Sequence, residues 1–371
     1  MNVDKERQQV LLSQIATCLQ CNDCGAMCPF SVVTENDAYS PQNKILQLEP
    51  LMKGEELSPE GYDAVYLCSR CGACNDACPA GIDIMAIIQC ERGLLQEQER
   101  EPQKTTHISH NILTAYNPKG APNDNRNDLW ITEDMELSPD STVAYMAGCW
   151  IALKNVSIAH DTMKILNACG ITPRAIEGER CCGLFLIDNG HLDDMRAYAK
   201  EYTEYLEALG IKTIITSCPA CYKVLGTEYE ALFRKPAFEV KHVLQVYKEL
   251  YDAGKLSFEP QSGTVALRDA CPLKDLFDIP RELLAAAGYE VKEIKNDHVF
   301  CCGAPAGAKP NYPEISGAVG KVSLERSQGA DTLATYCSFC KHHLDGIKES
   351  EGEGGIPVED IASLLVKAMK R

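Results

Sequence analysis

Cysteines are the residues of this chain most able to do chemistry, and the 371-residue sequence contains 20 of them. Eight fall into two runs with the same spacing, and each run ends in Cys-Pro. The runs are Cys18, Cys21, Cys24, Cys28 with Pro29, and Cys68, Cys71, Cys74, Cys78 with Pro79. Cysteines make up about 5% of the chain, below the share typical of short disulfide scaffolds. Because thiolates are soft metal ligands, this spacing indicates metal ligation.

The spacing within each run is typical of bacterial ferredoxins that bind two [4Fe–4S] cubane clusters. In such proteins the fourth cysteine of each run ligates the cluster of the other run. We therefore expect one cluster at Cys18, Cys21, Cys24 and Cys78, and another at Cys68, Cys71, Cys74 and Cys28. Two zinc knuckles are the alternative, but zinc sites usually pair two Cys-x-x-Cys hooks, which this spacing fits poorly. The long segment between the runs contains a plausible helix at Asn43–Met52, as in elaborated ferredoxins.

Ten further cysteines occur as two sets of five, about 120 residues apart. Each set has a single cysteine, then Cys-Cys-Gly, then Cys-x-x-Cys. The first set is Cys149, Cys181, Cys182, Cys218 and Cys221, and the second is Cys271, Cys301, Cys302, Cys337 and Cys340. The separations nearly coincide between the copies, so the sequence indicates an internal repeat.

The segments around these cysteines alternate between strand-like and helix-like patterns. Short apolar runs that end just before a cysteine predict strands at Thr142–Ala147, Lys212–Thr216, Thr264–Leu267 and Asp331–Thr335. Helical spacing predicts helices at Ile82–Glu101, Ile158–Ala168, Leu192–Leu209, Pro280–Ala287 and Ile315–Gln328. Alternation of this kind predicts small parallel sheets, whose strand carboxyl ends bind ligands. The overall fold class is α+β, with a mostly helical ferredoxin-like module followed by two α/β repeats.

Each Cys-Cys pair is followed by a glycine, Gly183 or Gly303. A glycine there allows a positive φ and a close approach of the backbone to a bound cluster, so both are candidate cofactor-binding residues. An ordinary turn glycine is the alternative.

Cys90 and Cys169 lie outside the two kinds of cysteine motif, in apolar helical contexts, and are expected to be buried thiols. An exposed pair is expected at His342-His343, with a position near the second cluster as the alternative. Solvated surface charges are expected at Arg70 and Lys309, with tuning of a cluster's potential as the alternative.

The sequence carries 53 acidic against 36 basic residues, a formal charge of -17. This charge disfavours nucleic acid and anionic membrane as direct partners. No apolar run approaches the roughly 18 residues that span a bilayer, and no signal-peptide pattern occurs at the amino terminus. We therefore expect a cytoplasmic protein without a transmembrane segment of its own, for which any membrane association would be peripheral and through a partner.

The arrangement of motifs resembles the heterodisulfide reductase family, through its CCG motifs and the order of its parts. In that family a ferredoxin-like C-type subunit acts with a B-type subunit that has two CCG domains, and the D-type subunit fuses them in this order. The domains expected are a two-cluster ferredoxin-like domain (1–115), a linker (116–141), and CCG domains at 142–255 and 256–371.

The resemblance implies that each complete set of five cysteines holds a noncubane [4Fe–4S] cluster that contacts substrate sulfur, so all ten cysteines are candidate catalytic ligands. It implies an oxidoreductase subunit acting on sulfur groups, and a role in methanogenesis. Electrons would pass through two cubane clusters to two noncubane clusters for cleavage, or reverse formation, of a disulfide such as CoM-S-S-CoB. Pro272 departs from the family, whose members often have histidine there. Any contact made by that imidazole is thereby in doubt.

Related flavin dehydrogenase complexes provide the alternative function. Anaerobic glycerol phosphate, glycolate and lactate enzymes contain electron-transfer subunits with the same motifs, while their substrate chemistry lies on a flavoprotein. No dinucleotide, P-loop or flavin motif occurs in this chain, so a redox protein must donate electrons. A flavin-bearing A-type subunit, a hydrogenase, a formate dehydrogenase or a membrane cytochrome could serve, with a small disulfide or thiol as substrate.

Overall fold

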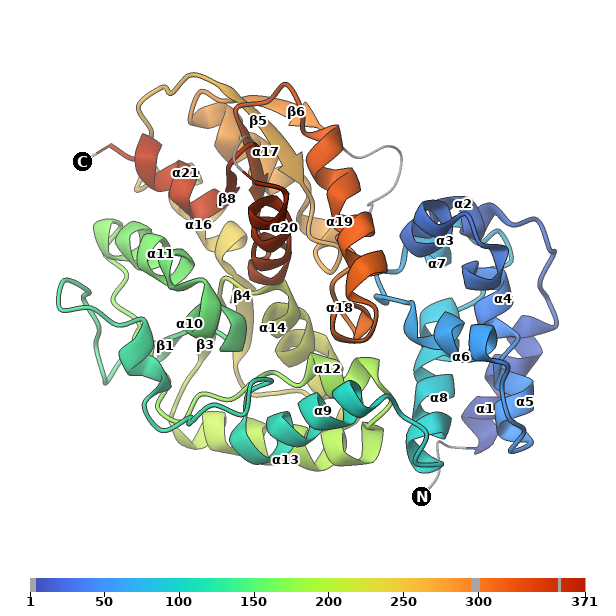
Figure 1. Ribbon diagram of the computed structural model, residues 1–371. Coiled ribbons are helices and arrows are strands. Elements are labelled where there is room, and N and C mark those ends of the chain that lie inside the picture. The colour runs from blue at the N-terminus through green and yellow to red at the C-terminus, as the bar shows by residue number, and fades with distance from the viewer. Residues whose placement is uncertain (1–4, 295–300, 353–354, 371) are drawn as a thin grey trace. The chain divides into compact units, whose positions relative to one another are not determined.

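The computed structural model describes residues 5–294, 301–352 and 355–370, and the chain divides into two compact units. The first unit contains residues 1–110, 185–195 and 295–323, and the second contains the remainder. Figure 1 shows the elements of each. Among the described residues, no helix is both long and apolar enough to cross a bilayer.

Short helices make up the first unit. They are α1 (Lys5–Ile15), α2 (Asp23–Met27), α3 (Pro29–Thr34), η1 (Asp37–Tyr39), α4 (Pro41–Ile45), α5 (Leu48–Met52), α6 (Pro59–Tyr66), α7 (Ala73–Ala77), α8 (Ile84–Glu97) and α18 (Ala308–Asn311). Four helices contain residues of both units, namely α9 (Gln103–Ala115), α12 (Leu184–Asp188), α13 (Leu192–Ala208) and α19 (Pro313–Arg326).

Local sequence explains how several of these helices begin and end. Ser40 and Ser58 each precede a proline, and their hydroxyls accept hydrogen bonds from the N–H groups of Asn43 and Gly61 at 3.3 and 3.0 Å. The expected single helix at Asn43–Met52 is wrong, because the structure has α4 and α5 instead. Pro50 explains the break, since it has no N–H to donate to the carbonyl four residues earlier.

Two four-stranded parallel sheets form the centre of the second unit. Their strands are β1 (Val143–Met146), β2 (Arg174–Ala175), β3 (Thr213–Thr216) and β4 (Glu239–His242), and then β5 (Thr264–Arg268), β6 (Glu290–Glu293), β7 (Thr332–Thr335) and β8 (Val358–Asp360). The strand orders are β2-β1-β3-β4 and β6-β5-β7-β8. The two sheets therefore share one topology, which confirms the repeat and the predicted α+β fold class.

Helices cover these sheets and carry the shared core of the second unit. They are η2 (Arg126–Leu129), α10 (Cys149–Lys154), α11 (Val156–Ala168), α14 (Pro219–Lys223), η3 (Val224–Glu228), α15 (Tyr229–Leu232), α16 (Val243–Asp252), η4 (Lys274–Leu276), α17 (Asp278–Ala286), α20 (Ser338–Glu351) and α21 (Ile361–Ala368). One apolar cluster combines residues of both repeats, such as Ile158 on α11 and Leu365 on α21. The four predicted strands match β1, β3, β5 and β7, and each leads to a cysteine.

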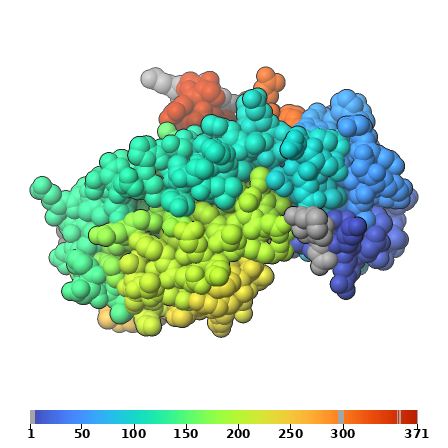
Figure 2. Space-filling view, turned by 90° about the horizontal axis from the view of Figure 1, so that it is seen from below, coloured from blue at the N-terminus to red at the C-terminus, as the bar shows by residue number. Residues whose placement is uncertain are grey.

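Residues 116–141, expected as a linker, belong to the second unit. Within this segment Asn117, Arg126 and Trp130 are buried, and the ring of Tyr116 lies 6.2 Å from that of Tyr198 on α13. In Figure 2 the segment is the teal band beside the yellow-green residues of α13.

Asp360 gives the second unit a pH dependence. Its buried carboxylate caps α21 by accepting a hydrogen bond from the Ala362 N–H at 2.9 Å, and burial raises the pKa of Asp360 to about 7. An unfolded aspartate titrates near 4. The preference of the folded protein for a neutral Asp360 carboxyl therefore contributes fully to stability below about pH 4, and this contribution is lost as the pH rises through 7. We expect Asp360→Asn, which keeps a capping oxygen, to gain on the order of 4 kcal/mol over the parent protein across that window.

Thermal unfolding under anaerobic conditions at pH 5 and pH 8 would measure this gain. Asp252→Asn is the matched control, because the Asp252 side chain is 54% exposed. A stability difference for Asp360→Asn that is equal at both pH values would contradict the prediction.

Candidate metal centres

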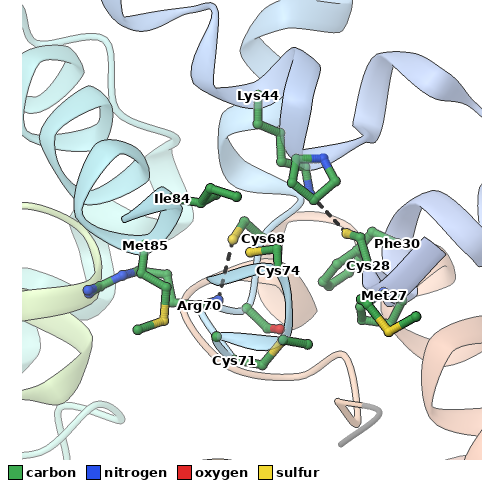
Figure 3. A pocket seen from close by; sticks show the side chains of 15 residues that line it. Met27, Cys28, Phe30, Lys44, Cys68, Arg70, Cys71, Cys74, Ile84 and Met85 are labelled. Carbon is green, nitrogen blue, oxygen red and sulfur yellow. Dashed lines mark hydrogen bonds between the residues drawn. The ribbon is translucent and has the colours of Figure 1, made fainter. Parts of the chain in front are cut away.

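Two hollows in the first unit are each lined by four cysteines. One is lined by Cys28, Cys68, Cys71 and Cys74 (Figure 3). The other is lined by Cys18, Cys21, Cys24 and Cys78. Each hollow therefore combines three cysteines of one run with the last cysteine of the other. Four sulfurs around one hollow fit a cubane cluster, although ligation itself stays a prediction.

Tight turns bring the first three cysteines of each run together. Three non-glycine residues in these turns have positive φ, namely Gln20 (56°), Asn22 (61°) and Arg70 (49°). Such backbone conformations are uncommon outside glycine and mark a turn held by its surroundings. In the second run the Arg70 N–H donates to the Cys68 sulfur at 3.4 Å. Backbone N–H groups aimed at sulfur are the contacts that tune iron–sulfur clusters.

Lys44 lies at the hollow that contains Cys28, and the sequence analysis did not identify it. It is buried on α4, and its ammonium donates to the Leu67 carbonyl and lies 3.6 Å from the Cys28 sulfur. Burial alone would lower the pKa of Lys44, but its electrostatic interactions with neighbouring Cys28, Cys68 and Cys74 outweigh burial and raise the pKa. One sequence signal could have indicated its burial. Lys44 precedes the buried residues Leu48 and Leu51 at the spacing of one helix face.

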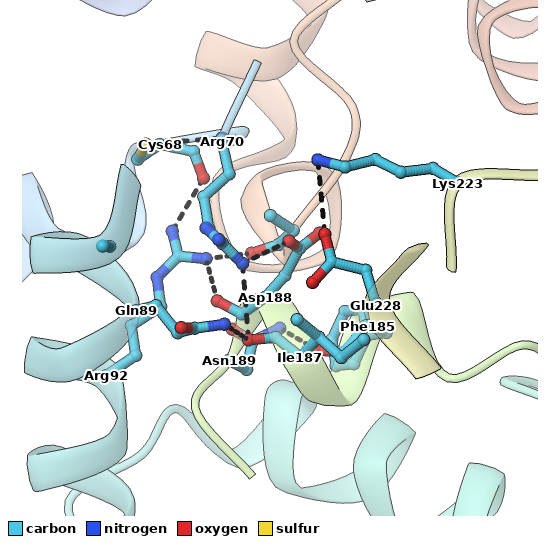
Figure 4. A network of polar contacts seen from close by, with 12 residues as sticks. Cys68, Arg70, Gln89, Arg92, Phe185, Ile187, Asp188, Asn189, Lys223 and Glu228 are labelled. Carbon is cyan, nitrogen blue, oxygen red and sulfur yellow. Dashed lines mark hydrogen bonds and ion pairs between the residues drawn. The ribbon is translucent and has the colours of Figure 1, made fainter. Parts of the chain in front are cut away.

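A network of buried polar groups supports the second cysteine turn (Figure 4). Arg70 forms an ion pair with Asp188 at 2.6 Å, so the expectation of a solvated Arg70 is wrong. The guanidinium of fully buried Arg92 donates to the carbonyl of Cys68 at 2.7 Å and to that of Ala306 at 2.9 Å. Lys309 is partly exposed. The network fixes the turn on which Cys68 and Cys71 lie.

The Cys-Cys pair of the second repeat also belongs to the first unit, where it meets the ferredoxin run. The Ser69 hydroxyl donates to the Cys301 sulfur at 3.0 Å. A hydrogen bond from Cys301 is the main cause that lowers the pKa of Cys71 to about 6. A predicted ligand of a cubane cluster and a predicted ligand of a CCG set are therefore in direct contact.

The first set of five cysteines converges within the second unit. The sulfurs of Cys149 and Cys181 are 3.6 Å apart. Further contacts join Cys181 to Cys182, Cys182 to Cys221, and Cys221 to Cys218. The five thiols therefore form one continuous group at the carboxyl ends of β1 and β3. Contacts from Cys149 and Cys182 lower the pKa of Cys181 well below its usual value, which favours a thiolate there.

A buried carboxylate holds the loop that precedes Cys149. Glu179 accepts hydrogen bonds from the N–H groups of Ala147 and Gly148 at 3.1 and 2.9 Å. Burial raises the pKa of Glu179, and nearby Arg126, at 3.8 Å, acts against this shift. Gly148 has a φ of 80°, and a Cβ there would lie 3.2 Å from the Cys221 sulfur. The loop therefore requires glycine for close packing against the thiols.

The carbonyls of the first Cys-Cys pair are held by two tyrosines. Tyr198 donates to the carbonyl of Cys181 at 2.8 Å, and Tyr229 to that of Cys182 at 3.2 Å. Gly183 and Gly303 both have the expected positive φ, 85° and 83°. At Gly303 an added Cβ would meet Val319 at 2.7 Å, so that glycine is required by packing against α19.

The second set of five is divided between the two units. Cys271, Cys337 and Cys340 belong to the second unit, whereas Cys301 and Cys302 belong to the first. Convergence of this set therefore stays a prediction. Within the second unit, buried Arg268 donates to the Cys340 sulfur at 3.1 Å. Among the described residues, no group of three or more His, Cys, Asp or Glu is arranged to hold a single metal ion.

The remaining candidates are distributed as follows. Cys90 is buried, as expected, whereas Cys169 is only partly buried, with its sulfur 3.5 Å from the Lys255 carbonyl. The expectation of an exposed histidine pair is wrong, because His343 is buried. His342 is partly buried and packs on Trp150, with ring centroids 5.0 Å apart. On helix α20 the two neighbours point in different directions, so only one side chain reaches the core.

Comparison with known proteins defines the class. Residues 14–82 match the 4Fe-4S dicluster domain, and residues 143–226 and 269–345 match the cysteine-rich CCG domain. The chain is therefore an iron–sulfur protein that combines a dicluster ferredoxin domain with tandem CCG domains, and the resemblance to the heterodisulfide reductase family is confirmed.

Particular relatives extend along nearly the whole chain. The D-type subunit of dihydromethanophenazine:CoB--CoM heterodisulfide reductase from Methanosarcina barkeri is 28% identical and aligns with 98% of this chain and 96% of its own length. The B-type subunit of fumarate reductase (CoM/CoB) from Methanothermobacter marburgensis is 26% identical over 94% of this chain and 71% of its own length. EtfAB:quinone oxidoreductase of Syntrophomonas wolfei is 28% identical over 91% of this chain and 51% of its own length. These relatives are oxidoreductases or their subunits, and the similarity places this chain among redox proteins.

Proposed function

We propose that this chain is the iron–sulfur subunit of a heterodisulfide-reductase-type complex, and that it cleaves or forms a disulfide such as CoM-S-S-CoB. The convergence of the first set, Cys149, Cys181, Cys182, Cys218 and Cys221, carries the proposal. Five thiols in continuous contact, four of them buried and that of Cys218 partly buried, are more than packing requires, and their shared position suits one polynuclear cluster. When bound, such a cluster supplies single electrons and a Lewis-acidic iron for substrate sulfur.

The chain's own residues would prepare this site in three ways. Glu179 orients the loop before Cys149 through two backbone hydrogen bonds. Tyr198 and Tyr229 fix the Cys-Cys pair through its carbonyls. The lowered pKa of Cys181 keeps a thiolate available for iron. We assign the equivalent ligand role in the second repeat to Cys271, Cys301, Cys302, Cys337 and Cys340.

Electrons would reach these sites from a partner through the ferredoxin module. The contacts of Cys301 with Ser69 and with Cys71 support this route, because they join the two kinds of predicted ligand in one unit. The donor would be a flavin-bearing protein, a hydrogenase, a formate dehydrogenase or a membrane cytochrome. Through such a partner the protein would act in the cytoplasm or at the membrane surface.

A relay subunit of a larger oxidoreductase is the second candidate. The similarity to EtfAB:quinone oxidoreductase favours it, since that name denotes no thiol or disulfide substrate. In that case the CCG sites would pass electrons without binding substrate.

Thiol binding separates the two candidates, because a disulfide-cleaving site must bind thiolate products. We expect coenzyme M or coenzyme B, added to oxidised protein free of partners, to change the electron paramagnetic resonance (EPR) signal of a CCG cluster. Reduced viologen should support turnover of the matching disulfide. Protein that retains all its iron but shows neither response with a panel of thiols would favour the relay.

A further inference from the structure

The two cysteine-lined hollows of the first unit differ in charge. The side chains around Cys18, Cys21, Cys24 and Cys78 are all neutral, and Asn22 and Gln42 are the polar ones. The hollow around Cys28, Cys68, Cys71 and Cys74 has the ammonium of Lys44 at its wall, with the nitrogen 3.6 Å from the Cys28 sulfur (Figure 3). The two runs therefore share their cysteine spacing but differ in the charge of the side chains around their hollows.

The charge of Lys44 is not cancelled by a carboxylate. In the described part of the chain its hydrogen bonds go to the Leu67 carbonyl and the Cys28 sulfur, and it forms no ion pair. Glu91 is the buried acid nearby, and burial raises its pKa well above the ordinary value, which favours its neutral form. Arg70 is already paired with Asp188 at 2.6 Å.

Other buried groups add to the positive field rather than opposing it. Arg92 is fully buried and donates to the Cys68 carbonyl at 2.7 Å. A fixed cation in a poorly polarisable interior acts strongly on a charge that appears beside it, because water cannot screen the interaction. A cluster that gains an electron becomes more negative, so a neighbouring cation stabilises its reduced form.

We propose that Lys44 raises the reduction potential of the cluster at Cys28, Cys68, Cys71 and Cys74 above that of its neighbour at Cys18, Cys21, Cys24 and Cys78. Electrons then favour the end of the module where Cys71 contacts Cys301. Lys44 acts as a tuning residue rather than a ligand. The inference rests on the proposed function, since it requires both cubane clusters.

A redox titration of the whole anaerobic protein, followed by EPR, tests the role of Lys44. In Lys44→Met we expect the ratio of reduced to oxidised cluster, at a fixed potential, to fall roughly tenfold or more for one cubane signal. Tenfold equals about 59 mV for a one-electron couple. Lys53→Met is the matched control, because Lys53 has a 57% exposed side chain on the same segment and should leave both signals unchanged. Lys44→Arg should restore most of the potential.

A second variant moves the charge to the other hollow. Gln42 is partly buried at the neutral hollow, so Gln42→Lys should raise the potential of the other cubane signal and leave the Lys44-dependent signal in place. This measurement decides the matter if Lys44→Met loses iron. If Lys44→Met keeps its iron, unchanged potentials in that variant would overturn the inference. If Lys44→Met loses iron, unchanged potentials in Gln42→Lys would overturn it. Parent protein without two cubane signals would instead contradict the proposed function.

Discussion

Replacing Cys182 with serine is expected to remove about four of the roughly sixteen irons that two cubane and two noncubane clusters would contain. Cys182 lies between Cys181 and Cys221 in the continuous group of thiols, so its loss breaks the group into two parts. A hydroxyl is a harder and more weakly acidic ligand than a thiol and does not replace it at a soft site. Iron and sulfide analysis of anaerobically purified protein measures the loss.

The same variant should also lose the EPR response of the first repeat to added thiols. Cys169→Ser is the matched control, because Cys169 lies in the same unit and its sulfur contacts the Lys255 carbonyl rather than the group of five thiols. It should keep the full iron content and the thiol response. A Cys182→Ser protein with undiminished iron would show that the five thiols of the first repeat do not hold a cluster together.

The strands that lead to cysteines could be predicted because they are short apolar runs with a fixed relation to the motif. β1 and β3 end shortly before Cys149 and Cys218, and the repeat provides an independent second example in β5 and β7. The grouping of the eight ferredoxin-run cysteines could be stated in advance for a similar reason. Spacing along the chain fixes which thiols a tight turn can bring together.

The residues that support these thiols could not be predicted, because their role depends on contacts distant in sequence. Glu179 reaches back more than thirty residues to the loop at Gly148, and Arg126 lies in a stretch whose composition indicates a linker. Lys44 and Arg70 look like surface charges in a local window. Only the fold reveals that Lys44 faces sulfur and that Asp188 pairs with Arg70.

The surroundings of the second Cys-Cys pair could not be predicted from the sequence either. Cys301 and Cys302 recur in register with Cys181 and Cys182, yet they pack in the unit that contains the ferredoxin runs. Sequence repetition predicts equivalent ligands but cannot indicate that Cys301 also meets Ser69 and Cys71. Under the proposed function, this contact would make the second repeat the receiver of electrons from the ferredoxin module.

Replacing Cys74 with serine is expected to reduce turnover driven by a protein donor to background, while turnover driven by a small viologen continues. Cys74 lines the hollow that also contains Cys71, the residue in contact with Cys301. Loss of this site interrupts the route to the CCG sites, whereas a viologen can reduce those sites directly. Cys90→Ser is the control, since Cys90 is buried in α8 outside both hollows.

A companion variant, Cys24→Ser, determines the order of the two ferredoxin sites. Cys21 is exposed in the hollow that contains Cys24, so a protein donor can approach that site from solvent, and Cys71 lies at the opposite end of the route. With a reduced protein donor, we expect Cys74→Ser to show one reduced cubane signal and oxidised CCG sites. Cys24→Ser should show neither cubane nor CCG reduction, because the donor has lost its acceptor. Freeze-quench EPR of the two variants provides the comparison. The reverse pattern would mean that electrons enter at the Cys71 site, and the contact with Cys301 would then be a branch rather than the exit.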